Sequence, residues 1–165
     1  MYRIQKNKRV LFLTKNEEVL YEFKYQKWSS SKGDFYCGEQ YVSIRPRNMM
    51  GQKFDITKDN TEVGEITFNW KGQMSIQVED SNYRKHTFFI RSKGFWKSYY
   101  EILNADDKVL FKLKPKFVWK AFGYNFDIEI DHFSYNKEEL ALFEEVFMYV
   151  VFGINVQMSQ ASGAA

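Results

Sequence analysis

The amino-acid sequence predicts a mainly β protein with one helix: a closed antiparallel β-barrel of about twelve strands around a hydrophobic C-terminal central helix. Aromatic residues make up 19% of the chain and proline occurs only twice, a composition typical of strands and not of disordered chain. Up to about residue 131, short apolar runs alternate with turn-forming clusters such as TKNEE, TKDNTE and NADDK. Near the end of the chain, a predicted helix contains the uncharged run from Val146 to Ile154 and has no polar stripe, so it has to be surrounded by other groups.

The length of 165 residues fits one domain. We expect this domain to span residues 1–158, with the helix at about 137–152, and residues 159–165 to form a flexible tail. Cys37 is the only cysteine, which excludes an internal disulfide and favours a reducing compartment. The apolar run near the N-terminus, Val10 to Leu13, is too short for a signal peptide. The expected location is therefore cytoplasmic, with peripheral association at a membrane as an extension of it.

Three stretches of sequence read alike as strand, polar turn, strand. They are LFLTKNEEVLYEF (11–23), FDITKDNTEVGEITF (54–68) and YEILNADDKVLFKL (100–113). Stacked hairpins of this kind predict a sheet that closes on itself, because a long run of short strands otherwise leaves exposed edges.

Two later stretches alternate with a period of two. In FKLKPKFVWK, one face is predicted to carry Phe111, Leu113, Phe117 and Trp119, and the other Lys112, Lys114, Lys116 and Lys120. Pro115 lacks a backbone donor, so we expect a break, a bulge or an edge there. In GYNFDIEID, the residues Tyr124, Phe126, Ile128 and Ile130 alternate with polar residues, which predicts a strand with one solvated face.

The helix is predicted to begin at about Lys137. Asn136 is a preferred N-cap, and Glu139 stands at the capping-box position. We expect the barrel lumen to be filled by Leu140, Phe143, Phe147, Val150 and Val151. A membrane span is the alternative, but it needs about 20 apolar residues, and two glutamates interrupt this stretch.

This pattern resembles the tubby C-terminal domain, the phospholipid scramblases and the LURP-one-related proteins, which share a barrel closed around a central helix. YEILNADDKVLFKL is similar to the repeated hairpin of LURP-one-related proteins, and FDIEIDHFSYNKEELALFEEVFMYVVFG looks like the last strand and central helix of a scramblase. Asn60 and Asp107 stand where that hairpin usually has glycine. The cysteine-rich and proline-rich segments of many scramblases are absent, so scrambling activity is not inferred.

No catalytic motif occurs in the sequence, so we expect a protein that is not an enzyme and has no cofactor and no metal. His86 and His132 lack the partners of a metal or catalytic site. The turn acids Asp59, Asp106 and Asp107 lack the spacing of a calcium loop.

Basic residues give the best functional indication. Residues 1–120 hold 23 Lys or Arg and 14 Asp or Glu, a balance of +9, whereas residues 121–165 hold 1 and 7, a balance of −6. The four lysines of residues 112–120 form one row. Two further basic clusters, Arg45 with Arg47 and Arg91 with Lys93 and Lys97, lie near the aromatic residues Tyr41, Phe95 and Trp96 in the sequence. The candidate residues for binding an anionic partner are Lys112, Lys114, Lys116, Lys120, Arg91, Lys93, Lys97, Arg45 and Arg47.

The leading hypothesis is a non-enzymatic binding or scaffold module that engages anionic phospholipid head groups or a protein partner through this basic face. One alternative is a nucleic-acid-binding β-barrel. Another is a small enzyme or lipid carrier with an open barrel. A lysine row also suits a solubilising strand face that guards against aggregation.

Overall fold

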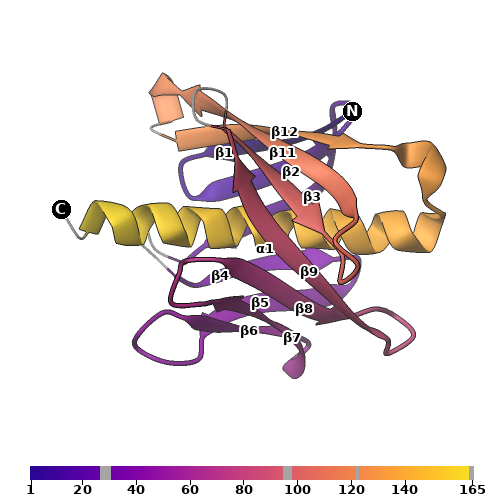
Figure 1. The fold of residues 1–165 in the computed structure, drawn as a ribbon, viewed down its shortest axis with the longest axis horizontal. Helices are drawn as coiled ribbons and strands as arrows, with labels where there is room; N and C mark the ends of the chain where they lie inside the picture. Colours follow the sequence, from indigo (N-terminus) through magenta and orange to yellow (C-terminus); the bar gives the residue numbers. More distant parts are fainter. Residues whose placement is uncertain (27–30, 95–97, 122, 164–165) are drawn as a thin grey trace.

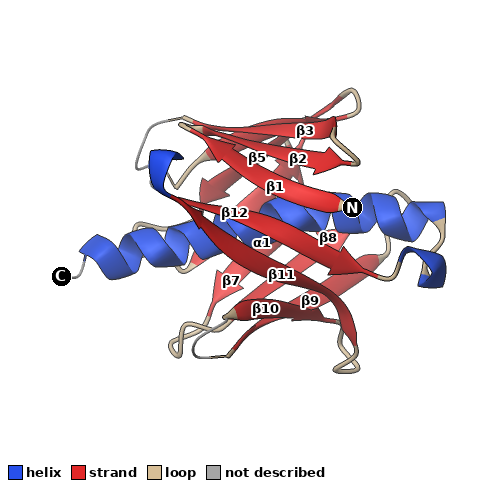
Figure 2. Ribbon diagram, turned by 90° about the horizontal axis from the view of Figure 1, so that it is seen from above, coloured by secondary structure: helices blue, strands red, loops and turns tan. Residues whose placement is uncertain are grey.

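A computed structural model describes residues 1–26, 31–94, 98–121 and 123–163, and it confirms the predicted fold class. Twelve antiparallel strands form a closed barrel, and helix α1 (Lys137–Gly163) runs through it along its axis (Figure 1, Figure 2). Each strand pairs with its neighbours in the chain. The barrel closes where β1 meets β12, with Tyr2 opposite Ile128 and Ile4 opposite Phe126. This closure leaves the sheet without an open edge.

The strands are short, as the turn spacing predicts. They are β1 (Tyr2–Asn7), β2 (Val10–Lys15), β3 (Glu18–Tyr25), β4 (Gly33–Cys37), β5 (Gln40–Pro46), β6 (Lys53–Lys58), β7 (Thr61–Phe68), β8 (Met74–Glu79), β9 (Lys85–Lys93), β10 (Tyr99–Leu103), β11 (Val109–Val118) and β12 (Gly123–Ile130). Two short 3₁₀ helices, η1 (Trp119–Ala121) and η2 (His132–Ser134), follow β11 and β12.

The three similar stretches of sequence form equivalent hairpins, β2–β3, β6–β7 and β10–β11, four strands apart around the barrel. Each hairpin has a register shift at the same place, next to Leu13, Ile56 and Ile102. Asn60 and Asp107 have φ angles of 65° and 60°, the left-handed region that Asn and Asp tolerate better than other non-glycine residues. They can therefore take the place of the glycine that the resemblance leads one to expect.

Side chains of the helix fill the lumen. All residues from Val146 to Ile154 are buried, as the absence of a polar stripe predicts. Gly153 permits the close approach of the helix to β8, because a Cβ atom there would lie 2.1 Å from the Met74 sulfur. The open lumen that a lipid carrier of the predicted alternative kind would need is thus occupied by this helix.

Both ends of the helix can be compared with the prediction. The Asn136 side chain accepts from the Glu139 amide at 2.9 Å and the Glu139 carboxylate accepts from the Asn136 amide at 2.8 Å, so the predicted capping box is confirmed. The predicted end at about residue 152 is wrong, because the helix continues to Gly163. Residues 159–163 are accordingly helical and not a tail.

The predicted faces of the last two strands hold only in part. Phe111 and Leu113 are buried, but Phe117 is 44% exposed at the end of the barrel, and Trp119 and Lys120 leave the strand in η1. Pro115 pairs in register with β12, while the ladder to β10 has its last pair at Leu113. Within the described strands, Pro115 is therefore paired on one flank of β11 only, which is the edge-like setting that its missing donor favours.

Candidate functional site

The predicted basic residues lie on opposite sides of the barrel. Lys112, Lys114 and Lys116 are on β11, whereas Arg45 is on β5 and Arg47 follows it. Five strands separate β5 from β11 in either direction around the barrel. The two groups therefore form no common lateral face.

On the β9–β12 side, acids lie between the cations. Arg91, Glu101, Lys112 and Glu129 occupy one cross-strand row, so that positive and negative residues alternate. Lys114 forms an ion pair with Glu129. The Lys112 ammonium lies 5.5 Å from the centre of the Tyr99 ring. This face therefore has a mixed charge and not a uniform positive one.

On this face, Asp127 pairs with two cations. It is almost buried on the outer side of β12, where its carboxylate accepts from Arg3 Nε at 2.8 Å and pairs with Lys116. Burial alone would raise the pKa of Asp127, but the hydrogen bonds from Lys116 and Arg3 outweigh it and hold the pKa below its usual value. The strand that was expected to have a solvated face thus has one covered carboxylate.

Acids also pair with the cations of β5. Arg45 Nη2 lies 2.6 Å from Asp34 Oδ1. Arg47 donates to Asp55 at 2.7 Å and lies 3.0 Å from Glu65. Of the other predicted residues, Lys93 ends β9, and Lys97 lies outside the described residues together with its neighbours Phe95 and Trp96.

The two ends of the barrel have opposite charge. At the end where the C-terminus of α1 emerges, on the left in Figure 1, the strands are joined by the connections 8–9, 26–32, 47–52, 69–73, 94–98 and 119–122. We call this the cationic end, because its connections contain no Asp or Glu in the sequence. Its described cations are Lys8, Arg9, Lys32, Arg47, Lys71 and Lys120.

At the opposite end, where α1 begins, the connections are 16–17, 38–39, 59–60, 80–84, 104–108 and 131–136. Carboxylates dominate them. They hold Glu17, Glu39, Asp59, Asp80, Asp106, Asp107 and Asp131, against Arg84 and Lys108. The barrel is therefore polarised along its axis, a property that a focus on single strands missed. The signal was present in the sequence, because successive turns alternate between basic and acidic.

Large apolar side chains are exposed at the cationic end. Trp70 and Trp119 are 86% and 78% exposed, and Met49 and Met50 project from the connection between β5 and β6. The Lys71 ammonium lies 5.1 Å from the centre of the Trp70 ring. Cations and interfacial aromatic residues thus occur on the same end of the molecule.

A hollow of about 740 Å³ opens at the cationic end beside the last turns of α1. We call it the exit hollow. Its lining includes Lys6, Lys8, Arg9, Tyr25, Ser31, Met49, Met50, Gly51, Phe54, Phe117, Gly123, Tyr124, Asn155, Val156, Met158, Ser159 and Gln160. Among the described residues, this lining has three cations, many apolar side chains and no side-chain carboxylate.

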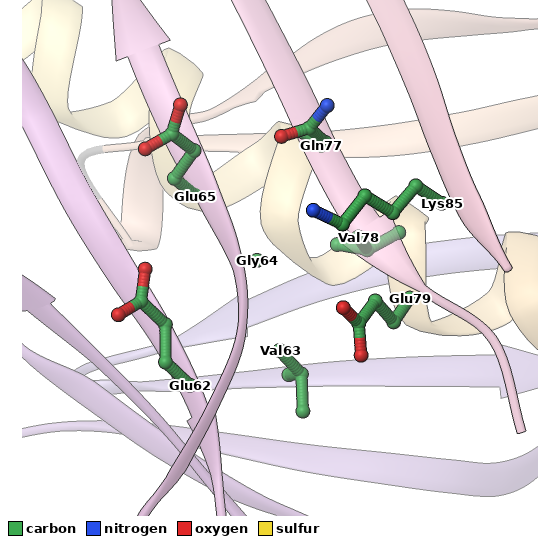
Figure 3. Close-up of a pocket in the computed structure, with 8 residues that line it drawn as sticks. All are labelled: Glu62, Val63, Gly64, Glu65, Gln77, Val78, Glu79 and Lys85. Carbon is green, nitrogen blue, oxygen red and sulfur yellow. The ribbon is translucent and has the colours of Figure 1, made fainter. Parts of the chain in front are cut away.

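A second, smaller hollow of about 320 Å³ lies between β7 and β8 (Figure 3). Glu62, Glu65 and Glu79 surround it, and Lys85 reaches in from β9. Gly64 lies among these residues (Figure 3), and a side chain would not fit there, because a Cβ atom would lie 2.2 Å from the Gln77 carbonyl oxygen. Arg47 already pairs with two of these acids, Glu62 and Glu65.

Near the start of α1, Glu145 lies at the centre of a polar cluster in the lumen. Glu145 accepts from Lys58 at 2.7 Å and from the Tyr149 hydroxyl at 3.2 Å, and the Cys37 sulfur lies 3.2 Å from it. Burial, together with the neighbouring Glu145 carboxylate, raises the pKa of the Cys37 thiol to about 11. The thiol is therefore protonated at neutral pH, which does not suit a nucleophile.

Each of the two histidines contacts a neighbouring side chain, an acid or an aromatic ring. His86 Nε2 lies 2.9 Å from Asp80, and the His132 ring stacks on Tyr2 with the centroids 5.0 Å apart. Within the described ranges, His, Cys, Asp and Glu side chains form no group of three that could hold a metal ion.

Comparison of the chain with protein-family models, with curated proteins and with solved structures finds no match. No helix in the described part of the chain has the length and apolarity needed to cross a membrane.

Proposed function

We propose that this chain is a non-enzymatic binding module of the tubby-like type, and that its cationic end docks on the surface of an anionic phospholipid membrane. The observation that carries this proposal is the separation of charge between the two ends of the barrel. Each lysine or arginine close to an anionic bilayer contributes about 1 kcal/mol, provided that no protein carboxylate neutralises it. Among the described residues, Lys8, Arg9, Lys71 and Lys120 have no carboxylate partner.

The two exposed tryptophans of the cationic end support the same orientation. Tryptophan favours the level of the lipid head groups, where its ring is apolar and its N–H can be hydrated. Trp70 and Trp119 each precede a lysine, Lys71 and Lys120, so that aromatic and cationic groups would reach the membrane together. Docking by the end also explains the surplus of acids at the other end, which would face away from the membrane.

The lysines of β11 take a secondary part in this proposal. Lys114 and Lys116 have carboxylate partners and lie on the side of the barrel. Lys120, at the end of the same row, belongs to the cationic end. Of the residues predicted from the sequence, it is therefore the one most directly involved.

Vesicle flotation with two matched variants tests the proposal. The first variant, Lys8→Glu, Lys71→Glu and Lys120→Glu, changes the cationic end, and the second, Lys85→Glu, Lys108→Glu and Lys137→Glu, makes the same change in charge near the acidic end. Phosphatidylcholine vesicles with phosphatidylserine should bind the wild type and the second variant but not the first, and binding should weaken with salt. Equal binding of the two variants, or binding to pure phosphatidylcholine, would contradict it.

Nucleic acid is the second candidate, because bases stack on exposed aromatic rings next to cations. Trp70 with Lys71 is the observation that favours it. A single-stranded oligonucleotide in place of the vesicles distinguishes the two functions, since a steep loss of oligonucleotide affinity with salt would support this candidate.

A further inference from the structure

The exit hollow differs in kind from the flat part of the cationic end. Its walls come from the connections β1–β2 and β5–β6, from the ends of β11 and β12, and from the last turns of α1. A volume of about 740 Å³ is within the range of small-molecule sites in proteins. A single ligand molecule can therefore be accommodated next to the helix.

Side chains near the end of α1 connect the helix to the barrel. Gln157 donates to the Gly72 carbonyl, and Gln160 Nε2 lies 3.4 Å from the Gly51 carbonyl oxygen. Deeper in, Asn155 Nδ2 donates to the Tyr25 hydroxyl at 2.9 Å. These bonds hold the helix in a fixed position beside the hollow, so that the space does not depend on a loose helix end.

One wall of the hollow is cationic. Lys6 shares the inward face of β1 with Tyr2 and Ile4, which are buried, so its side chain points toward the mouth of the barrel. Gly123 leaves room for it, since a Cβ atom there would lie 2.8 Å from Lys6 Cδ. Lys8 and Arg9, both exposed, continue this wall along the turn that follows β1.

The remaining wall and the floor are largely apolar. Phe54 and Val156 are buried beneath the hollow, and Phe117, Tyr124 and Met50 line its sides. Cationic groups on one side and aromatic and thioether groups on the other complement a molecule with an anionic head and a hydrocarbon chain. A hydrophilic anion would leave the apolar wall without a contact, and a neutral hydrocarbon would leave the exposed Lys8 and Arg9 without a contact.

We propose that the exit hollow binds one anionic amphiphile, with a phosphate or carboxylate head at Lys6, Lys8 and Arg9 and a hydrocarbon chain along Phe117, Tyr124 and Met50. This inference rests on the proposed function and adds to it a site for a single molecule within the membrane-facing end. The ligand can come from a membrane or from solution, because the head and chain chemistry is the same.

Titration of the full chain with monomeric octyl phosphate, followed by backbone NMR shifts and calorimetry, tests this site. We expect saturable binding of one molecule, with shifts at Gly123 and Met50. Octyl glucoside has the same chain without the charge, and inorganic phosphate has the charge without the chain. Each should bind at least about tenfold more weakly than octyl phosphate. Binding that does not saturate, or equal affinity for octyl glucoside, would overturn the inference.

Paired variants separate this site from membrane docking. Replacing Lys8 and Arg9 by Gln should weaken octyl phosphate binding about tenfold or more, because two charge-assisted contacts are lost. Replacing Lys71 and Lys120 by Gln should leave octyl phosphate affinity unchanged while it weakens vesicle binding. Vesicle binding without octyl phosphate binding would refute the hollow alone, and octyl phosphate binding without vesicle binding would refute the docking surface alone.

Discussion

The Glu145 carboxylate lies 2.7 Å from the Lys58 ammonium, inside the barrel, and the two side chains are only 13% and 14% exposed. Glu145 belongs to the central helix and Lys58 to β6, so this ion pair connects the helix to the strands of the barrel. Rotating the helix or sliding it along the barrel would bury both charges without partners. We infer that the pair fixes the position of a helix whose other buried side chains are mostly apolar.

Loss of this pair should be costly. Lys58→Met leaves Glu145 without its cation and should lower the free energy of unfolding in urea by about 3 kcal/mol. Combining it with Glu145→Met should restore much of the loss. Lys53→Met, at an exposed position of the same strand, should change stability by about 0.5 kcal/mol or less. Equal effects of Lys58→Met and Lys53→Met would show that Glu145 needs no partner.

The barrel should not be stable without its helix. A chain of residues 1–136 loses Phe143, Phe147, Val150 and Val151 from the lumen, each worth roughly 1.5 to 3 kcal/mol, against a usual total stability of about 5 to 15 kcal/mol. We expect no cooperative thermal transition for this chain. Residues 1–160, which keep all four side chains, should retain one. A transition of residues 1–136 near that of the full chain would exclude the helix as a necessary part of the core.

Acid should weaken the protein through Asp127. Its pKa is lower in the folded chain than the unfolded value of about 3.9, so its contribution to stability is complete above that value and is lost as the pH falls through the folded pKa. Lys116→Met removes one of the groups that lower this pKa, and it should flatten the fall of unfolding free energy below about pH 4. Lys120→Met is the control. An unchanged acid profile in Lys116→Met would rule out this coupling.

Cys37 should be unreactive in the native protein. Because the pKa of its half-buried thiol is about 11, little thiolate exists at pH 7.5, and iodoacetamide should label it far more slowly in buffer than in urea. Mass spectrometry measures both rates. Similar rates in the two conditions would mean that the Cys37 environment opens readily.

Glycine at the repeated turn should stabilise the barrel. Asn60 has a φ angle of 65°, which costs an asparagine more than a glycine, so Asn60→Gly should add a few tenths of a kcal/mol to about 1 kcal/mol to the unfolding free energy. Asn82→Gly, where φ is not positive, should not stabilise. Loss of stability in Asn60→Gly would imply that the asparagine side chain contributes to the turn.

Much of the fold could be predicted from the sequence, because period-two patterns and a helix without a polar stripe restrict the choices strongly. The end of the helix could not, since Gly153 and the polar residues after it suggest a stop. Gly153 serves instead for close packing on Met74, and Gln157 and Gln160 bond to connections that only the folded barrel brings near. Tertiary contacts override local preference there.

The site was predicted less well, for two different reasons. Pairing of Lys114 with Glu129 was foreseeable, since consecutive strands of a meander pair and one is basic and the other acidic outside. The alternation of basic and acidic turns could also have been predicted from the sequence. By contrast, the exit hollow depends on where the end of α1 lies in the mouth of the barrel, and no periodicity of the sequence encodes that position.

Closure of the barrel between β1 and β12 has a consequence for biosynthesis. A ribosome delivers the strands first and the helix last, although the helix forms the centre of the core. Until α1 has emerged, the nascent sheet has no partner for its aromatic inner face. In addition, β1 can pair with β12 only after more than a hundred further residues have been synthesised. Such non-local closure slows folding and leaves hydrophobic surface open to aggregation or to chaperones. Production of this protein should therefore benefit from low temperature or added chaperones more than its small size alone would suggest.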